Sequence, residues 1–482
     1  MRYTPVVKVI GILLMIFSIS MLPPIAVSIY YKDGSLMSFF FGFVITFLVG
    51  FFLWLPTRSS ESELKIRDGF LVVVLFWTVL SGFASIPMML VFFPKLTFVD
   101  AMFESVSGLT TTGATVLTHL SQLPHALLYY RQQLHLLGGM GIIVLAVAIL
   151  PMLGVGGMQL YRAETVGPIK TTKLRPRMAE TAKALWYIYA ALVILCAISY
   201  WWAGMDLFDA IGESFSTMST GGFSTHDSSF AYYNSTLIDM IAVIFMLAGA
   251  TNFALHFNFL RQRRLSVYYK DPELKAYALL LLSVTVVIVI MLIAYRRYDY
   301  THSVVNSLFT VVSVATTTGL TTSNFSLWPT FVPYLIMVMA MIGGCGGSTS
   351  GGIKVMRTLL LKEQGKRELK RLVHPQAVIS IKFGGEILPE QVVQSIWGFV
   401  SVFITLFFIL LMGLLATGLG LKTAFGALAS CIANTGAAIG SVSSNFEHIP
   451  AVSKWILIFA MIAGRLEIFT LLVLFTPSYW RR

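Results

Sequence analysis

Charged residues are scarce in this 482-residue sequence: Asp, Glu, Lys and Arg make up only 12% of it, while 56% of the residues are hydrophobic. A soluble globular protein carries about 25% charged residues, so most of the surface of this chain cannot face water. The deficit argues against a soluble enzyme, a secreted disulfide scaffold and a nucleic-acid-binding domain. The length leaves room for roughly ten crossings of ~20 residues each. We therefore predict an all-α, polytopic integral membrane protein.

Cysteine is also rare, and its placement excludes further classes. Cys196, Cys345 and Cys431 lie in apolar or Gly-rich stretches and form neither a CxxC motif nor a metal-ligand spacing. The sequence shows no nucleophile–base pair and no metal-binding constellation. We therefore predict that the chain is not an enzyme and that it binds no organic cofactor itself.

What the sequence has instead is a series of long apolar runs. Most of these runs contain no charge, and a helix is required because lipid cannot satisfy free backbone groups. We interpret the first of these runs as a membrane span and not as a signal peptide. The ten predicted spans are Val6–Tyr30, Ser35–Leu55, Phe70–Phe93, Leu134–Tyr161, Ala184–Ala203, Leu237–Leu260, Ala276–Tyr295, Leu327–Ile353, Val392–Leu421 and Trp455–Phe475.

The basic residues orient these spans. The chain has 34 Lys and Arg against 22 Asp and Glu, a net charge of +12. The two termini and the loops after the even-numbered spans hold 26 of the 34 basic residues, and the opposite loops hold seven. Because basic residues accumulate on the cytoplasmic side, both termini are predicted to be cytoplasmic.

The four long outer loops carry an internal repeat. Each begins with an apolar stretch too short to cross a membrane, as in a re-entrant helix. Each then has a Ser six residues before an aligned Gly: Ser107 and Gly113, Ser216 and Gly222, Ser313 and Gly319, and Ser430 and Gly436. The aligned triplets, here called the filter segments, are Thr111-Thr112-Gly113, Thr220-Gly221-Gly222, Thr317-Thr318-Gly319 and Asn434-Thr435-Gly436.

The filter segments predict a cation pore. Irregular backbone at membrane depth must be buried in protein or line a watery path. Glycine tolerates positive φ, so backbone carbonyls can turn toward a common axis and replace the hydration shell of a cation. Uncharged carbonyls suit a monovalent ion better than Ca²⁺ or Mg²⁺. Simple enrichment of Thr, Ser and Gly in outer loops remains the alternative for any single copy.

The repeat divides the chain into five parts. Four units of span, pore helix and span surround a central ion pore in pseudo-fourfold symmetry, and a two-helix hairpin precedes them. The predicted boundaries are 1–68 for the hairpin and its loop, 69–176 for repeat 1, 177–270 for repeat 2, 271–386 for repeat 3 with a gate loop, and 387–482 for repeat 4.

A glycine-rich stretch interrupts the eighth span. A helix interior loses up to ~1 kcal/mol for each Gly relative to Ala, so six glycines in ten residues predict an unwound loop facing the pore. Close helix packing of the GxxxG type is the alternative. The candidate gate residues are Gly343, Gly344, Gly346, Gly347, Ser348, Thr349, Ser350, Gly351 and Gly352.

Arg465 lies within the last apolar run, and a charge at that depth is a functional-site hypothesis. Its guanidinium has five donors that suit the carbonyls of a loop, and its charge would oppose a cation leaving the filter. A local pair with Glu467 is the alternative. His135 and His256 are interpreted as packing residues. The acids Glu104 and Glu213 are interpreted as anchors of the filter segments, with attraction of cations at the vestibule as the alternative.

A basic cluster follows the glycine-rich stretch. It is predicted either to orient the chain in the membrane or to bind anionic lipid or an acidic partner. Its members are Lys362, Lys366, Arg367, Lys370 and Arg371.

The filter segments, the Gly343–Gly352 loop and Arg465 together resemble the Trk/Ktr/HKT superfamily of potassium transporters. The extra N-terminal hairpin makes the chain more similar to the bacterial Trk-type membrane subunit than to the eight-span Ktr type. The resemblance implies transport of K⁺ and Rb⁺ over Na⁺ across the bacterial inner membrane and a homodimer with one pore per protomer. It also implies a cytoplasmic regulatory subunit of the TrkA type that binds nucleotides, a loop that obstructs the pore, and an arginine, here Arg465, that contacts it.

Two function classes remain open from the residues. The first is a channel-like pore for K⁺ uptake. The second is an ion-coupled secondary transporter, a K⁺/H⁺ or K⁺/Na⁺ symporter, which would also use Gly-interrupted spans. Paired broken helices in matching halves and an acid for coupling would favour the second class.

Overall fold

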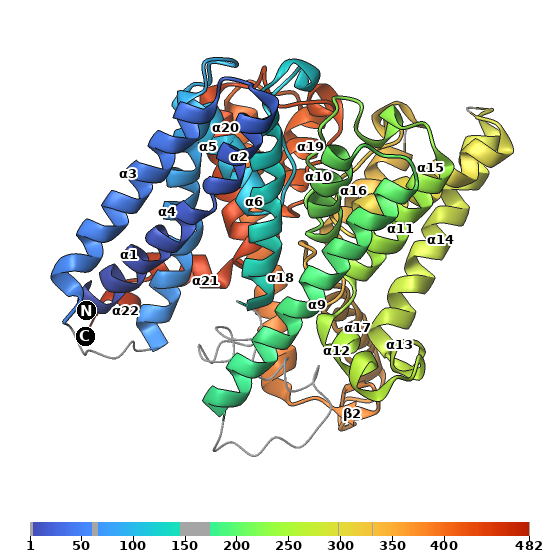
Figure 1. Ribbon diagram of the computed structural model, residues 1–482. Helices are drawn as coiled ribbons and strands as arrows, with labels where there is room; N and C mark the ends of the chain where they lie inside the picture. The colour runs from blue at the N-terminus through green and yellow to red at the C-terminus, as the bar shows by residue number, and fades with distance from the viewer. Residues whose placement is uncertain (1–2, 60–65, 145–173, 297, 330, 482) are drawn as a thin grey trace.

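The computed structural model describes residues 3–59, 66–144, 174–296, 298–329 and 331–481. Within these ranges the protein is nearly all helical (Figure 1), which confirms the predicted fold class. The strands described are β1 (Lys382–Phe383) and β2 (Glu386–Ile387), which pair antiparallel with Lys382 opposite Ile387. Short 3₁₀ turns follow several helices: η1 (Leu55–Thr57), η2 (Leu120–Gln122), η4 (Ser229–Tyr232), η5 (Phe325–Leu327), η6 (Gly440–Val442) and η7 (Val473–Phe475).

The first two predicted spans form a hairpin beside the rest of the bundle. The first span breaks after Ile19, just before Pro23 and Pro24, which lie at the start of its second half. Proline is tolerated in the first turn of a helix because the backbone N–H groups of that turn make no intrahelical hydrogen bond, so the N–H that proline lacks is not missed. The hairpin packs against repeat 1. Its helices are α1 (Tyr3–Ile19), α2 (Leu22–Tyr31) and α3 (Leu36–Trp54).

The four repeats each contain a long helix, a shorter pore helix and a returning helix. Repeat 1 has α4 (Ile66–Leu90), α5 (Phe98–Leu109) and α6 (His125–Val144), and repeat 2 has α9 (Leu174–Trp202), α10 (Leu207–Met218) and α11 (Thr236–Ala250). Repeat 3 has α14 (Pro272–Ala294), α15 (Tyr300–Ala315) and α16 (Val332–Ile342), and repeat 4 has α18 (Glu390–Ala416), α19 (Leu421–Ile432) and α20 (Ala451–Arg465).

The repeats close into a ring. The returning helix of each repeat packs against the pore helix of the next: α6 on α10, α11 on α15, α16 on α19, and α20 back on α5. The pore helices are therefore brought to the centre of the bundle, where most of their residues are buried. This cyclic order is the architecture that the sequence repeat predicts.

The described residues are consistent with the predicted ten spans but do not by themselves establish that count. Six helices are long and apolar enough to cross a membrane, or eight if two bent pairs each count as one span. The predicted fourth span is represented by α6, which begins at His125, and its remainder lies outside the described residues. The eighth is reduced to α16, which ends at Ile342, before the glycine-rich loop.

Two predicted spans are wrong as continuous helices. The sixth bends by 95° between α11 and α12 (Phe253–Gln262), and the tenth by 109° between α20 and the segment Phe469–Phe475. At the first bend, the carbonyls of Gly249 and Ala250 accept hydrogen bonds from the glycine-rich loop, so a further helical turn is not needed to satisfy them. The remaining helices are α13 (Ser266–Lys270), α17 (Val355–Val373), α21 (Phe469–Leu472) and α22 (Pro477–Trp480).

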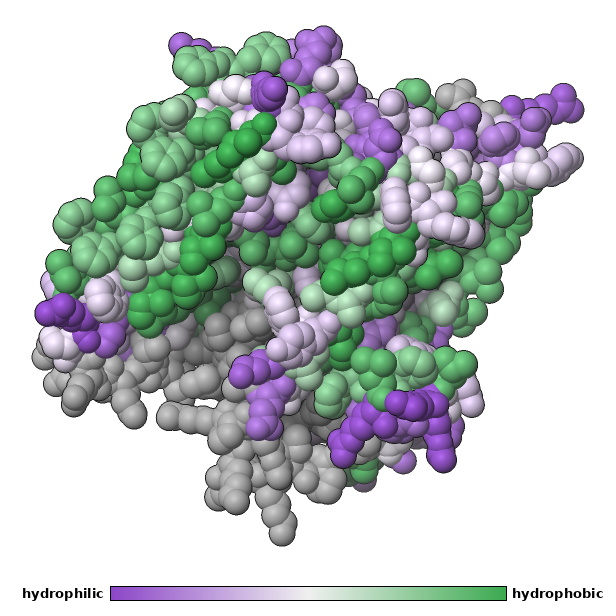
Figure 2. All heavy atoms as spheres, viewed as in Figure 1, coloured by the Kyte–Doolittle hydropathy of each residue, from purple (hydrophilic) through white to green (hydrophobic). Residues whose placement is uncertain are grey.

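The surface is banded. Figure 2 shows a broad hydrophobic zone across the helices, with hydrophilic residues gathered toward the upper and lower ends. The chain's large exposed apolar side chains fit lipid better than water, because a monomeric soluble protein rarely exposes such contiguous patches. The start of α1 and helix α22 lie at the same end of the bundle (Figure 1), as an even number of crossings requires.

Candidate functional site: a four-part filter and the loop beneath it

The turn after each pore helix has the same backbone hydrogen bonds in all four repeats. In repeat 1 the amide of Thr112 donates to the carbonyl of Ser107 (2.8 Å), and the amide of Thr111 donates to the carbonyl of Gly108 (3.1 Å). This pair of bonds is a Schellman motif, which satisfies carbonyls left free at a helix end. The aligned bonds to the Ser carbonyls are Gly221 to Ser216 (2.8 Å), Thr318 to Ser313 (2.8 Å) and Thr435 to Ser430 (2.9 Å).

Two residues of each filter segment have positive φ. The aligned glycines have φ between 77° and 89°. The residues two positions earlier, Thr111, Thr220, Thr317 and Asn434, have φ between 51° and 57°. Threonine is rarely left-handed because it is β-branched, and such a conformation costs on the order of 1–3 kcal/mol. It persists only where the surrounding structure imposes it, so the filter turns are held from outside.

The glycines show how the four segments meet. A Cβ built on Gly113 would lie 2.2 Å from the carbonyl oxygen of Gly221. The same holds around the ring, with each glycine facing the oxygen of the next repeat: Gly222 and Thr318 (2.1 Å), Gly319 and Thr435 (1.8 Å), and Gly436 and Thr112 (2.4 Å). No side chain fits at these distances. The four segments therefore enclose one axis, in the order in which they occur in the chain.

Buried acids hold the outer ends of the first two filter segments. Glu104 accepts hydrogen bonds from the amide of Val116 (3.0 Å) and from Thr115, and pairs with Arg131 (2.6 Å). The Arg131 guanidinium also lies over the ring of Phe223, 4.2 Å from its centroid, so it links repeats 1 and 2. These contacts agree with the predicted anchoring role.

Glu213 occupies the same place in repeat 2. It accepts from the hydroxyl of Ser224 (2.7 Å) and the amide of Thr225 (3.0 Å). Glu104 and Glu213 thus fix the chain segment that follows each of the first two filter segments. Both acids are buried.

Asn434 makes repeat 4 different from the others. Its Nδ2 donates to the hydroxyl of Thr112 in repeat 1 (3.0 Å) and to the carbonyl of Met461 (2.9 Å). The threonine at this position in the other repeats has no group that can donate twice. Asn434 is therefore a cross-link between the last and first segments of the ring.

The glycine-rich stretch is an irregular loop, as predicted. It runs from Gly343 to Lys354 between α16 and α17, and Gly343, Gly347 and Gly352 have positive φ. Its side chains are buried. The loop therefore occupies the interior of the bundle and is not a packed helix face.

The loop binds the inner ends of the pore helices. The Thr349 hydroxyl lies within hydrogen-bond distance of the carbonyls of Gly249 (3.0 Å) and Met218 (3.2 Å) and can donate its one proton to either of them. The Ser350 hydroxyl donates to the carbonyl of Thr316 (2.7 Å), and the amide of Gly351 donates to the hydroxyl of Thr317 (2.7 Å). These contacts place the loop directly beneath the filter, against repeats 2 and 3.

One acceptor and one donor hold the loop from the sides. Glu273, at the start of α14, accepts from the amides of Gly346 (2.9 Å) and Met356 (3.0 Å). The carbonyl of Gly347 accepts from the amide of Phe253 (3.1 Å). The sequence analysis missed Glu273, because an acid after Asp271-Pro272 reads as an ordinary helix start.

Arg465 reaches this loop, as predicted. It is 3% exposed, and its Nη1 donates to the carbonyl of Thr349 (2.9 Å). Its Nε and Nη2 have no hydrogen-bond partner among the described residues. A cavity of about 50 Å³ lies between Arg465 and the loop, which is space for a few water molecules.

Arg465 is not paired with Glu467, so the local-pair alternative is wrong. Glu467 instead binds Arg357 of α17 at 2.5 Å, and Arg357 lies 4.4 Å from the ring centroid of Phe399. Arg465 ends its helix, and Glu467 and Ile468 adopt positive φ at the 109° bend. Arg357 was missed because its position just after the loop gives no pairing signal in the sequence.

The other predicted residues are distributed around this centre. His135 is buried, stacks on Phe223 at 4.3 Å and lies 3.3 Å from the Ser216 hydroxyl. His256 bonds the Tyr268 hydroxyl (2.8 Å) and the carbonyl of Ala248 (2.9 Å). Both act in packing. Among the described residues no group of His, Cys, Asp and Glu could hold a metal ion.

The basic cluster is split by the structure. Arg367 is buried and binds both carboxylate oxygens of Glu390, at 2.7 and 2.9 Å. Lys366 pairs with Glu363 on the surface (2.6 Å), and Lys362 and Lys370 are exposed. Arg367 is thus a structural residue, whereas the lysines remain accessible.

Comparisons with known proteins agree with this architecture. A family described as "TrkH: Cation transport protein" matches residues 35–482. The Trk system potassium uptake protein TrkH of Salmonella typhimurium is 50% identical over 482 residues, which is all of both chains. TrkH of Halomonas elongata is 49% identical over 99% of each chain. TrkG of Escherichia coli is 42% identical over 98% of this chain and 97% of its own length.

A solved structure matches as well. The crystal structure of the potassium transporter TrkH from Vibrio parahaemolyticus has a TM-score of 0.93 and 47% sequence identity, with complete coverage of both chains. These relatives are named as transport proteins, which confirms the prediction of a transporter and not an enzyme. The chain belongs to the TrkH family of cation transport proteins.

Proposed function

We propose that the chain takes up K⁺ through a channel-like pore that selects K⁺ and Rb⁺ over Na⁺. The cyclic contact between filter glycines and neighbouring carbonyls carries this proposal, because it brings four carbonyl-bearing segments around one axis. The ligands are uncharged backbone oxygens, which suit a monovalent ion. The similar proteins named above are potassium uptake proteins, which supports K⁺ as the transported ion.

The loop Gly343–Gly352 is the proposed gate, and Arg465 is its latch. The loop obstructs the space beneath the filter, and the hydrogen bond from Arg465 to Thr349 holds it there. The guanidinium charge adds an electrostatic barrier to a cation leaving the filter. Release of this bond would open the path toward the cytoplasm.

A symporter is the second candidate, and the bent helices favour it. The breaks at α11–α12 and α20–α21 both lie beside the loop, and broken helices form the substrate sites of many secondary transporters. Glu467 is an acid at the second of these breaks. Its pair with Arg357 favours a structural role over proton coupling.

The assembly follows from the same family. We propose a homodimer in the bacterial inner membrane, with one pore per protomer, both termini in the cytoplasm and a nucleotide-binding subunit of the TrkA type on that side. The exposed Lys362, Lys366 and Lys370 on α17 suit an acidic partner or anionic lipid head groups.

Current measurements on the purified protein in a bilayer test the proposed function. A channel selective for K⁺ gives unitary currents whose reversal potential follows the K⁺ gradient in mixed K⁺/Na⁺ solutions. It also carries no current when only a proton gradient is applied. Uptake that needs a proton or Na⁺ gradient, without unitary currents, would establish the symporter instead.

A further inference from the structure

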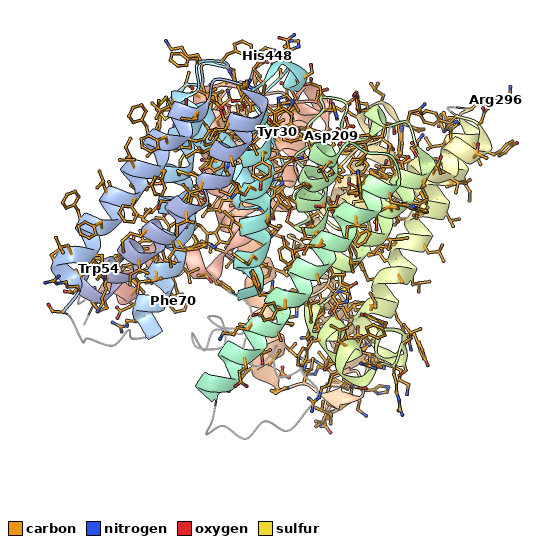
Figure 3. The ribbon with its side chains drawn as sticks, viewed as in Figure 1. Tyr30, Trp54, Phe70, Asp209, Arg296 and His448 are labelled. Carbon is orange, nitrogen blue, oxygen red and sulfur yellow. The ribbon has the colours of Figure 1, made fainter. Side chains whose placement is uncertain are left out.

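A second cavity lies at the end of the bundle where the pore helices begin (Figure 1). Its volume is about 690 Å³, and α2, the start of α6, α10 and the segment after filter segment 2 all line it. Tyr30 and Asp209 mark its two sides in Figure 3. Small-molecule sites of ~300–1,000 Å³ are typical of proteins, so this cavity has the size of a ligand site.

Aromatic rings form much of its lining. Tyr31 stacks on His125 with ring centroids 4.1 Å apart, and Phe208 meets Tyr31 edge-on at 5.4 Å. Tyr232 stacks on His226 at 3.5 Å. Tyr30 is 79% exposed, so part of this aromatic surface is available to a ligand.

The cavity contains two carboxylates and two histidines, His125 and His226. Asp206 and Asp209 line it, and none of its described lining residues is Lys or Arg. Asp209 binds His226 (2.7 Å) and Thr225 (2.9 Å), which fixes its position. Asp206 is exposed and directly precedes α10. Its side chain makes no capping hydrogen bond to that helix. The cavity therefore presents a carboxylate beside aromatic rings.

This combination favours an organic cation over a metal ion. Aromatic faces attract alkylated ammonium groups, which are weakly hydrated and large enough to touch several rings. A bare K⁺ or Na⁺ would need a shell of oxygen ligands that the rings do not supply. A neutral ligand would gain no attraction from the carboxylate of Asp206.

We propose that this cavity binds a small organic ammonium group. The group belongs either to a free alkylammonium ion or to the ammonium head group of a lipid such as phosphatidylethanolamine. The site is separate from the filter and from the gate loop, and it stands whether or not the chain conducts K⁺.

Calorimetry on the full-length purified protein tests the site with tetramethylammonium chloride as the probe and tert-butanol as its neutral analogue. We expect saturable binding of the ammonium ion alone. Asp206→Asn and Tyr30→Ala should each weaken it about fivefold or more, as for loss of one exposed charge or cation–π contact. Asp299→Asn is the matched control, because Asp299 precedes pore helix α15 in the same way but shares its cavity with Arg296 (Figure 3).

Three results of the calorimetry would contradict the proposed ammonium site. Equal binding of tert-butanol, equal weakening by Asp299→Asn, or competition by KCl that exceeds competition by NaCl would each overturn the proposal. Native mass spectrometry from phosphatidylethanolamine and phosphatidylglycerol nanodiscs identifies the source. Retained phosphatidylethanolamine that Asp206→Asn abolishes supports the lipid head group, whereas tetramethylammonium binding without retained lipid supports the free ion.

Discussion

The filter and the layer beneath it follow opposite rules. The four filter segments share the same Schellman bonds, the same pair of positive-φ positions and the same contact with the next repeat. Beneath them, one repeat supplies a loop and another supplies an arginine. An ion on the axis needs equivalent ligands from all sides, whereas an obstruction needs only one part that moves. Under the proposed function, selection would therefore be shared among the repeats, whereas control would not.

The loop contacts repeats 2, 3 and 4. It satisfies Thr316 and Thr317 in repeat 3 and contacts repeat 2 through Met218. In repeats 1 and 4, several buried hydroxyl oxygens have no hydrogen-bond partner among the described residues: those of Ser107, Thr111, Ser430 and Thr435. A Cβ built on Gly351 would lie 2.1 Å from the carbonyl oxygen of Ala433 in repeat 4, so the loop lies against that repeat as well, without bonding these hydroxyls.

The largest effect is expected from substitutions at the four aligned glycines, because each one makes its filter segment differ from the other three. Gly113→Ala, Gly222→Ala, Gly319→Ala and Gly436→Ala each force a Cβ into the carbonyl of the next repeat, at a position where φ is already unfavourable for alanine. We expect each change to abolish K⁺ current or to raise Na⁺ permeability at least tenfold, about 1.4 kcal/mol of discrimination. Reversal potentials in mixed solutions measure this.

A matched control is Gly365→Ala on α17. A Cβ there meets nothing within 4 Å, so its K⁺/Na⁺ ratio should be unchanged. Four normal permeability ratios in the filter variants would mean that these segments do not contact the permeating ion.

The next effect concerns the asymmetric layer. Arg465→Ala removes the donor to Thr349 together with the barrier charge, and deletion of residues 346–350 removes the obstruction. A hydrogen bond from a charged donor contributes about 1.5–3 kcal/mol, so we expect basal K⁺ flux to rise tenfold or more in either variant. Because both changes act on one obstruction, the combination should be clearly less than additive. Lower flux with normal expression would contradict a gating role.

A smaller effect is expected at the ion pair beside Arg465, the residue proposed to hold the gate loop in place. Glu467→Gln removes the ion pair with Arg357 at the bend after Arg465. Glu467 is 35% exposed, so we expect a loss of about 2 kcal/mol of stability, below the cost of breaking a fully buried pair. Basal flux should rise less than in Arg465→Ala. The exchanged pair Arg357→Glu with Glu467→Arg should recover part of both losses, and no recovery would indicate that the pair does not position the latch.

The smallest effect lies outside the pore, in the hairpin loop. Asp33 accepts from Ser28 (2.6 Å), from the Ser35 hydroxyl (2.7 Å) and from the amide of Ala126 (2.8 Å). Burial alone would raise the pKa of Asp33, but these hydrogen bonds outweigh it and hold the pKa below its ordinary value.

A lowered pKa has a defined consequence for stability. The contribution of Asp33 is present at neutral pH and is lost as the pH falls through the folded-state pKa, below ~4. Asp33→Asn should therefore lower the thermal midpoint at pH 7 by a few degrees, with a smaller difference at pH 4. A difference that grows on acidification would contradict the sign of the shift.

The sequence was most informative where its pattern recurs. The aligned Ser and Gly positions identified the filter turns, because each Ser carbonyl and each Gly φ is needed by the same local motif. Six glycines in ten residues identified the loop, because such a glycine content is unfavourable in a helix. The roles of these residues in K⁺ selection and gating stay predictions.

The bends and the lateral contacts could not be read from the sequence. The runs around Thr251 and Arg465 are as apolar as continuous spans, and they bend because other parts of the fold use their carbonyls and charges. Glu273 and Arg357 act on segments about 75 and 110 residues away, and a single sequence contains no signal for such pairs.

The contact between each filter glycine and the next carbonyl sets a lower limit on the width of the pore. Each aligned glycine lies so close to its neighbour's carbonyl oxygen that a Cβ would not fit between them, so the four segments have little room to move inward together. An ion smaller than K⁺ would stand away from the oxygens, and the ring could not contract to meet it. We therefore expect discrimination against Na⁺ to arise from steric contact between the repeats, and to need no stiffness within any one segment.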